Sequence, residues 1–272
     1  MSTNVMTINT ARKVRLRGIA LPNEHGSWGF LFEPLAAAFA VAPSFAAVWI
    51  SLLVIGAFLT RQPLKFLLGD LMQKKRLPRT ALALRFALIF GGIAFCGLVG
   101  SFYFAPAQSF IPFVIVLPPV VYLIAQDVSR RSRELWPEAL AAVALSSSIA
   151  ALALADGWNY PAAFALWAII AARLIPSVLY IRSRLRLEKG KKFTRFAPLA
   201  AHVLALAALV AFYFTGLASL LTVLMTAFLA ARAVVGLSAY RKIMKAKQLG
   251  VREVIYGVIY ALTIVVGYYL SV

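Results

Sequence analysis

Charged side chains inside apolar runs are the residues of this chain that could do chemistry. The sequence has 62% apolar side chains, with 28 lysines and arginines against nine aspartates and glutamates. An arginine at the centre of a bilayer costs about 2.5–3.5 kcal/mol, so a deep one needs a partner or a function. Arg173 and Arg232 lie deepest in their apolar runs. Snorkelling, an internal ion pair and contact with a ligand would each explain them.

Seven basic residues are candidates for binding an anionic group. Acids are scarce near the basic segments, so a cavity there would be electropositive. Arginine grips a phosphate or diphosphate through two parallel hydrogen bonds, which would suit such a cavity to an anionic head group. The candidate substrate-binding residues are Arg61, Lys65, Arg130, Arg131, Arg173, Arg182 and Arg184.

Three acids and a histidine are candidates for catalysis. Glu24 and His25 precede the first apolar run and could act as general base and proton shuttle. Glu33 would point at a buried base, Arg61 or Arg173, and a structural salt bridge would explain it equally well. The candidate catalytic residues are Glu24, His25, Glu33 and Asp70.

The sequence gives no sign of a cofactor or a metal site. It lacks a phosphate-binding loop of the G-x-x-x-x-G-K-[ST] type, a cluster of metal ligands, and a serine in a nucleophile elbow. Magnesium prefers carboxylate oxygens and a site this basic would repel it, so we expect no cofactor and disfavour magnesium. Nucleic acid is not an expected partner, because the positive charge follows the pattern of cytoplasmic loops.

Nine apolar runs must position these residues, which predicts an all-α bundle of nine transmembrane helices. Every lysine and arginine lies before the first run, or within or next to the connections that follow the second, fourth, sixth and eighth runs. The other connections carry none. Cytoplasmic loops retain lysine and arginine, so we expect a cytoplasmic N-terminus and a C-terminus outside. The predicted spans are residues 26–42, 44–60, 80–101, 110–125, 136–155, 159–181, 196–214, 217–238 and 253–270.

Two basic segments with similar starts, residues 61–80 and 173–195, are predicted to shape the site. Each begins with an arginine near the end of an apolar run and has a proline two or three residues later, Pro63 or Pro176. We expect the two segments to face each other at one membrane surface. Proline disrupts a helix interior but suits a helix start, so Pro63 is predicted to begin a separate amphipathic interfacial helix.

The chain divides into an arm and one domain. Residues 1–22 are polar and then basic, which predicts a cytoplasmic arm lying against anionic headgroups. Residues 23–272 predict a single transmembrane helical domain. Membrane lipids are therefore the expected partners, and the sequence does not identify a protein partner.

Three stretches resemble motifs of a known family. PNEHGSWGFLFEPL near the first span, and RQPLKFLLGD and RLIPSVLYIRSRLR further on, are similar to motifs of the YwiC-like family of bacterial integral membrane proteins. The resemblance implies a multi-pass protein of the bacterial plasma membrane. It does not imply an activity.

The arrangement of spans also resembles, more distantly, the UbiA family of intramembrane prenyltransferases. In that family the segments after spans two and six carry Asp-rich motifs that hold magnesium and a prenyl diphosphate, and a Lys-Arg pair follows span four. Arg130 and Arg131 stand where that pair would be. The expected carboxylates are reduced to Asp70 in the first segment and Glu188 in the second, so this resemblance implies a transferase without a full metal site.

Three functions are open at this point. The first is binding of an amphiphile with a phosphate or diphosphate head in a cytoplasmic-side cavity, with transfer of a group from it as a further step. There Asp70 and Glu33 would orient the arginines or act on the acceptor. The second is a transporter or flippase, with Glu24, His25, Glu33 and Arg173 on a proton or anion path. The third is a non-catalytic membrane assembly subunit.

Overall fold

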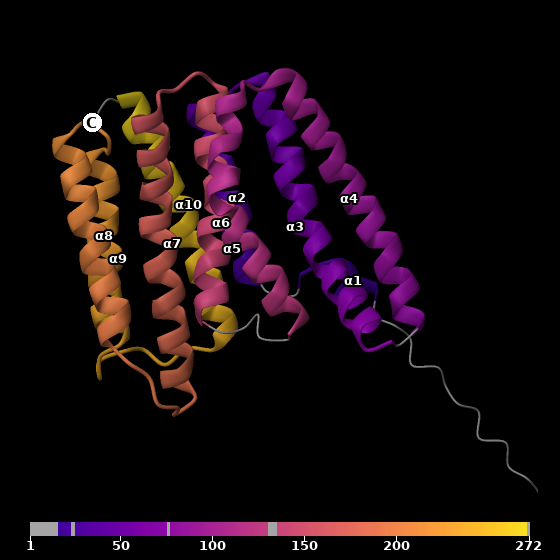
Figure 1. Ribbon diagram of the computed structural model, residues 1–272. Helices are drawn as coiled ribbons and strands as arrows, with labels where there is room; N and C mark the ends of the chain where they lie inside the picture. Colours follow the sequence, from indigo (N-terminus) through magenta and orange to yellow (C-terminus); the bar gives the residue numbers. More distant parts are fainter. Residues whose placement is uncertain (1–15, 23–24, 75–76, 130–134, 271–272) are drawn as a thin grey trace, which may run out of the picture.

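The structure is a computed structural model that describes residues 16–22, 25–74, 77–129 and 135–270 (Figure 1). Within these ranges the protein is all-α and contains no strand. The helices are α1 (Leu16–Ala20), α2 (His25–Val41), α3 (Phe45–Met72), α4 (Pro78–Phe104), the 3₁₀ helix η1 (Ala107–Phe110), α5 (Ile111–Val128), α6 (Leu135–Ala155), α7 (Tyr160–Glu188), α8 (Phe196–Phe214), α9 (Leu220–Gly236) and α10 (Ala246–Leu270).

Seven of the described helices are long and apolar enough to cross a membrane, namely α3 to α8 and α10. The predicted all-α, multi-pass architecture is thus confirmed. The first and eighth predicted spans coincide with α2 and α9, which have 17 residues each. Such a helix is about 26 Å long, slightly less than the ~30 Å hydrocarbon core. That these two helices also cross, which would make nine spans, stays a prediction.

The long helices run alternately up and down, side by side (Figure 1). The connections from α3 to α4, from α7 to α8 and from α9 to α10 lie at the lower end of the bundle in this view, and the described C-terminal end of α10 lies at the upper end. The basic connections therefore gather at one end, which we call the basic end. Its placement in the cytoplasm is a prediction from the positive-inside rule.

The core lies around α6 and α7, the most buried of the long helices. α6 packs against α2, α3, α5 and α7. Its centre is rich in alanine and serine, and small side chains let several helices approach one another closely in a membrane. α4 is the least buried long helix and packs mainly on α3 at one edge of the bundle.

Side-chain caps fix where two of the long helices begin. The Ser44 hydroxyl accepts a hydrogen bond from the amide of Ala47 at the start of α3, and the Asn159 side chain accepts one from Ala162 at the start of α7. Such caps satisfy backbone N–H groups that lack a partner within the helix.

Pro63 does not begin a new helix, so this prediction is wrong. α3 continues through Pro63 to Met72, and α7 likewise continues through Pro176. Membrane helices tolerate an internal proline because neighbouring groups compensate for the lost backbone hydrogen bond, and both prolines are buried. The 28 residues of α3 span about 42 Å, so the helix extends beyond the hydrocarbon core instead of turning along its surface.

Glycines allow α3 and α4 to touch along their backbones. A Cβ at Gly97 of α4 would overlap the backbone of Leu53 in α3, and a Cβ at Gly56 of α3 would overlap the backbone of Ala94 in α4. Small residues at a membrane helix interface permit such close contact. The position of α4 relative to α3 therefore depends on these two glycines.

Candidate functional site

A cavity of about 570 Å³ lies between α3, α4, α5 and α6. Its walls are almost entirely aliphatic and aromatic, with Leu53, Phe113 and Leu117 among the lining side chains. Among the described residues, the charged groups that line it lie toward the basic end, where Arg61, Lys65 and Asp127 meet. An apolar space with a few converging polar groups is the usual form of a small-molecule site.

Asp127 of α5 joins two cations of α3 beside this cavity. The Arg61 Nε donates to Asp127 Oδ2 at 2.6 Å, and Arg61 Nη2 donates to Oδ1 at 3.1 Å. The Lys65 Nζ lies 3.5 Å from the same Oδ1. The Asp127 side chain is 5% exposed, whereas Arg61 and Lys65 are 34% and 32% exposed. We call these three residues the cavity ionic group.

Asp70, a candidate catalytic residue, holds α4 to α3. Its carboxylate accepts hydrogen bonds from Arg79 Nε at 3.0 Å and from the Thr80 hydroxyl at 2.8 Å. Arg79 and Thr80 lie in the first turn of α4. Asp70 is buried and does not line the cavity. Its observed contacts are those of a structural brace between the two helices.

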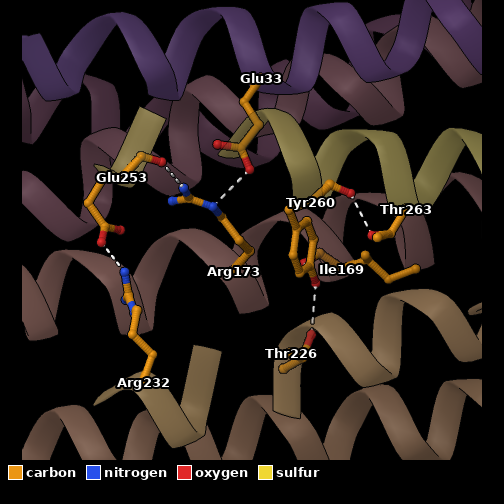
Figure 2. A network of polar contacts seen from close by, with 8 residues as sticks. All are labelled: Glu33, Ile169, Arg173, Thr226, Arg232, Glu253, Tyr260 and Thr263. Carbon is orange, nitrogen blue, oxygen red and sulfur yellow. Dashed lines mark hydrogen bonds and ion pairs between the residues drawn. The ribbon is translucent and has the colours of Figure 1, made fainter. Parts of the chain in front are cut away.

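A second group of charges lies inside the bundle, as Figure 2 shows. Arg173 Nε of α7 lies 2.9 Å from Glu33 Oε1 of α2, and Arg173 Nη2 donates to the backbone carbonyl of Glu253 at 2.8 Å. The Glu253 carboxylate of α10 pairs with Arg232 of α9. We call these four residues the inner ionic chain, because opposite charges alternate along it across four helices.

Aromatic rings and a glycine enclose the inner ionic chain. The Arg232 guanidinium lies 4.2 Å from the ring centroid of Tyr180 and 4.9 Å from that of Tyr256, both within the range of cation–π attraction. A Cβ at Gly257 would crowd the Glu33 carboxylate and Arg173. Beside them the fully buried Tyr260 donates its hydroxyl to the Ile169 carbonyl at 3.2 Å (Figure 2). The inner ionic chain is therefore tightly surrounded by other side chains of the protein.

Arg182 and Arg184 make contacts away from the cavity. The fully buried Arg184 donates to the backbone carbonyls of Gly236 and Lys242 and pairs with Glu188 at 2.7 Å. Arg184 therefore anchors the connection between α9 and α10. Arg182 of α7 pairs with Glu138 of α6 at 3.3 Å.

Of the predicted binding residues that the structure describes, Arg61 and Lys65 come together at the cavity, while Arg173, Arg182 and Arg184 do not line it. The expectation that the two arginine-proline segments face each other is wrong, because α3 and α7 each pack against α6, which lies between them. The sequence showed the two segments but not the helix that separates them.

Several candidates lie where the structure gives less information. Glu24, Arg130 and Arg131 lie outside the described residues. His25 is the first residue of α2, and only its backbone is described. Within the described ranges, no group of three or more His, Cys, Asp or Glu residues is arranged to hold a metal ion.

Asp127 lines the cavity but is not among the candidate site residues predicted from the sequence. Its signal is weak, since it is a lone carboxylate at the end of an apolar helix, and such residues often serve as ordinary interfacial charges. Asp127 becomes a candidate because it contacts Lys65 and Arg61, which lie 62 and 66 residues earlier in the chain. That proximity depends on how α5 packs against α3.

The fold and the cavity define this protein as a multi-pass helical membrane protein with an apolar cavity between α3, α4, α5 and α6. The family model of the YwiC-like protein matches residues 21–154, so the predicted resemblance to the YwiC-like family is confirmed over α2 to α6. The described residues that line the cavity all lie within this match. No curated protein and no solved structure matches the chain.

Proposed function

We propose that the cavity between α3 and α6 binds an amphiphile with an anionic head, with the tail against the apolar walls and the head at Arg61 and Lys65. The observation that carries this proposal is the position of the two cations, at the basic end of an otherwise apolar space of about 570 Å³. The ligand would come from the lipids or isoprenoids of the membrane, which in this proposal is the bacterial plasma membrane.

The electrostatics of the cavity favour such a head. Arg61 and Lys65 carry two positive charges, and Asp127 neutralises one of them, so the described cavity ionic group has a net charge of +1. Arginine binds carboxylates and phosphates through two parallel hydrogen bonds. The likeness to UbiA-type prenyltransferases extends the proposal to group transfer, in which these cations would neutralise a leaving phosphate.

Mass spectrometry of lipids retained by the purified protein tests this function. We expect one anionic amphiphile to be retained, and retention to fall about tenfold in the Arg61→Ala, Lys65→Ala double variant, since a hydrogen bond to a charged group is worth about 1.5–3 kcal/mol. Ala144→Phe, which fills the cavity from α6, should also lower retention. Ala211→Phe, on the exposed face of α8, is the matched control. Equal retention in all four proteins would refute the proposal.

The inner ionic chain supports a second candidate, a proton-coupled transporter. Glu33 and Arg173 are both almost fully buried, and intramembrane ion pairs of this kind occur on proton paths. In proteoliposomes with an imposed pH gradient, Glu33→Gln should abolish proton flux if this function is correct. If the variant shows the same proton flux as the wild-type protein, the inner ionic chain has a structural role and not a transport role.

A further inference from the structure

We infer that Asp127 occupies the position that the ligand's head group takes in the cavity, and that the ligand is an amphiphile whose anionic head presents two oxygens to Arg61. This inference rests on the proposed amphiphile site and adds its ligand class and its regulation. The ligand head would displace Asp127 from Arg61, so Asp127 competes with the ligand.

The geometry of the Arg61 pair supports this replacement. Asp127 meets the Nε and Nη2 edge of the guanidinium with both carboxylate oxygens, at 2.6 and 3.1 Å. A carboxylate or phosphate ligand would use this same edge, because its paired oxygens match the two parallel N–H groups. Asp127 also lines the cavity. Its carboxylate therefore stands where an incoming anionic head would bind most strongly.

Asp127 has a second cation to pair with once it is displaced. Lys65 Nζ lies 3.5 Å from Asp127 Oδ1, so a small rotation of the carboxylate would bring it closer to Lys65 while Arg61 takes the ligand head. Arg61 is one-third exposed, so it can exchange one partner for another without becoming a deeply buried lone charge. Asp127 is 5% exposed, so it depends on the Lys65 contact once Arg61 turns to the ligand head.

The cavity is elongated. Its lining along α3 runs from Leu53 to Leu68, a length of about 22 Å at 1.5 Å per residue, and most of that lining is apolar. This shape suits a hydrocarbon tail that lies along the helix.

The tail can enter from the surrounding lipid. Leu117 of α5 lines the cavity and keeps 57% of its surface exposed, and Ala57 of α3 is also both lining and exposed. Both residues lie in the apolar part of their helices. A chain could therefore slide in sideways while its head stays level with Arg61.

The test measures binding of radiolabelled palmitate to the full chain in phosphatidylcholine nanodiscs, by scintillation proximity. Two unlabelled competitors test the charge of the head: palmitate and uncharged 1-hexadecanol. We expect only palmitate to compete well. Equal competition by 1-hexadecanol would overturn the anionic head. This comparison needs no variant.

Two variants then test the competition by Asp127. Asp127→Asn keeps the shape of the side chain but removes its charge, and we expect palmitate affinity to rise about tenfold, or 1.4 kcal/mol. Asp127→Ser is the second variant, in case the first does not fold. Glu188→Gln, which alters an arginine-paired carboxylate away from the cavity, is the matched control and should leave affinity unchanged.

The failures of the two proposals are distinguishable. If Ala144→Phe abolishes palmitate binding but neither Asp127 variant increases it, the cavity binds amphiphiles and the inference about Asp127 is wrong. If palmitate does not bind and Ala144→Phe retains as much lipid as the wild-type protein, the proposed function fails and the inference fails with it.

Discussion

The cavity ionic group and the inner ionic chain differ in how deeply their arginines are buried. Arg61 keeps 34% of its side chain exposed, whereas Arg173 keeps 4% and its partner Glu33 keeps 6%. A deeply buried ion that loses its partner is left as an uncompensated charge, while a cation that reaches in from the surface can exchange one partner for another. The first group is therefore suited to binding and the second to holding helices together.

The two regions also differ in free space. Around the inner ionic chain, the rings of Tyr180 and Tyr256 cover Arg232, and the absent side chain of Gly257 leaves just enough room for the Glu33 pair. Beside the cavity ionic group lies a space of about 570 Å³. Similar charges thus accompany close packing in one half of the bundle and a cavity in the other.

The largest expected effect comes from breaking the inner ionic chain. Arg173→Ala leaves Glu33 buried without its cation, and we expect it to lower the free energy of unfolding by about 3–5 kcal/mol. Titration with sodium dodecyl sulfate in mixed micelles measures this change. The Glu33→Gln, Arg173→Met double variant, which removes both charges, should recover much of the loss. A double variant as unstable as Arg173→Ala would contradict this account of the pair.

A smaller effect is expected where α3 and α4 touch. Gly97→Leu places side-chain atoms against the Leu53 backbone, and such overpacking costs about 1–3 kcal/mol. It should also widen the cavity and weaken amphiphile retention. Gly92→Leu is the matched control on the same helix, because no atom lies within 4 Å of its added Cβ. The same unfolding titration should separate the two variants, and equal stability would argue against close backbone contact.

Loss of one ring beside Arg232 should cost less again. Tyr256→Leu removes a cation–π contact at 4.9 Å but keeps an apolar side chain, so we expect a loss of about 0.5–2 kcal/mol. Tyr240→Leu, at a tyrosine that is 94% exposed, is the comparison and should have little effect. A similar unfolding midpoint for both variants would show that the ring contributes no specific stabilisation.

The smallest effect on stability is expected at the cavity. Arg61→Ala leaves the buried Asp127 with Lys65 as a partner and removes an arginine that is one-third exposed, so we expect a loss of no more than about 1 kcal/mol. The variant should therefore unfold almost as the wild-type protein does while its retained lipid decreases. A loss of stability as large as that of Arg173→Ala would show that the two arginines serve the same structural purpose.

The helices could be predicted from the sequence because the spans are apolar and every second connection is strongly basic. The same reasoning predicted that Glu33 pairs with a buried base, and Arg173 was one of the two bases named. The cavity could not be predicted in this way. It depends on α6 lying between α3 and α7 and on α5 bringing Asp127 beside Arg61, and neither contact leaves a periodic signal in the sequence.

The proline in α3 shows a second limit of prediction from the sequence. Pro63 has a strong local preference for a helix start, yet it is buried inside a continuous helix. Packing against neighbouring helices outweighs that preference, because in a membrane an interrupted helix would leave backbone groups without hydrogen-bond partners. Local propensity therefore predicted the wrong boundary at this position.

The inner ionic chain also has a consequence for biosynthesis. Arg173 and Arg232 are synthesised before Glu253 of α10, whose backbone and carboxylate complete their contacts. Until α10 emerges from the ribosome and inserts, Arg232 has no Glu253 to pair with. Nascent chains that stop before α10 should thus be recognised by membrane quality-control proteases.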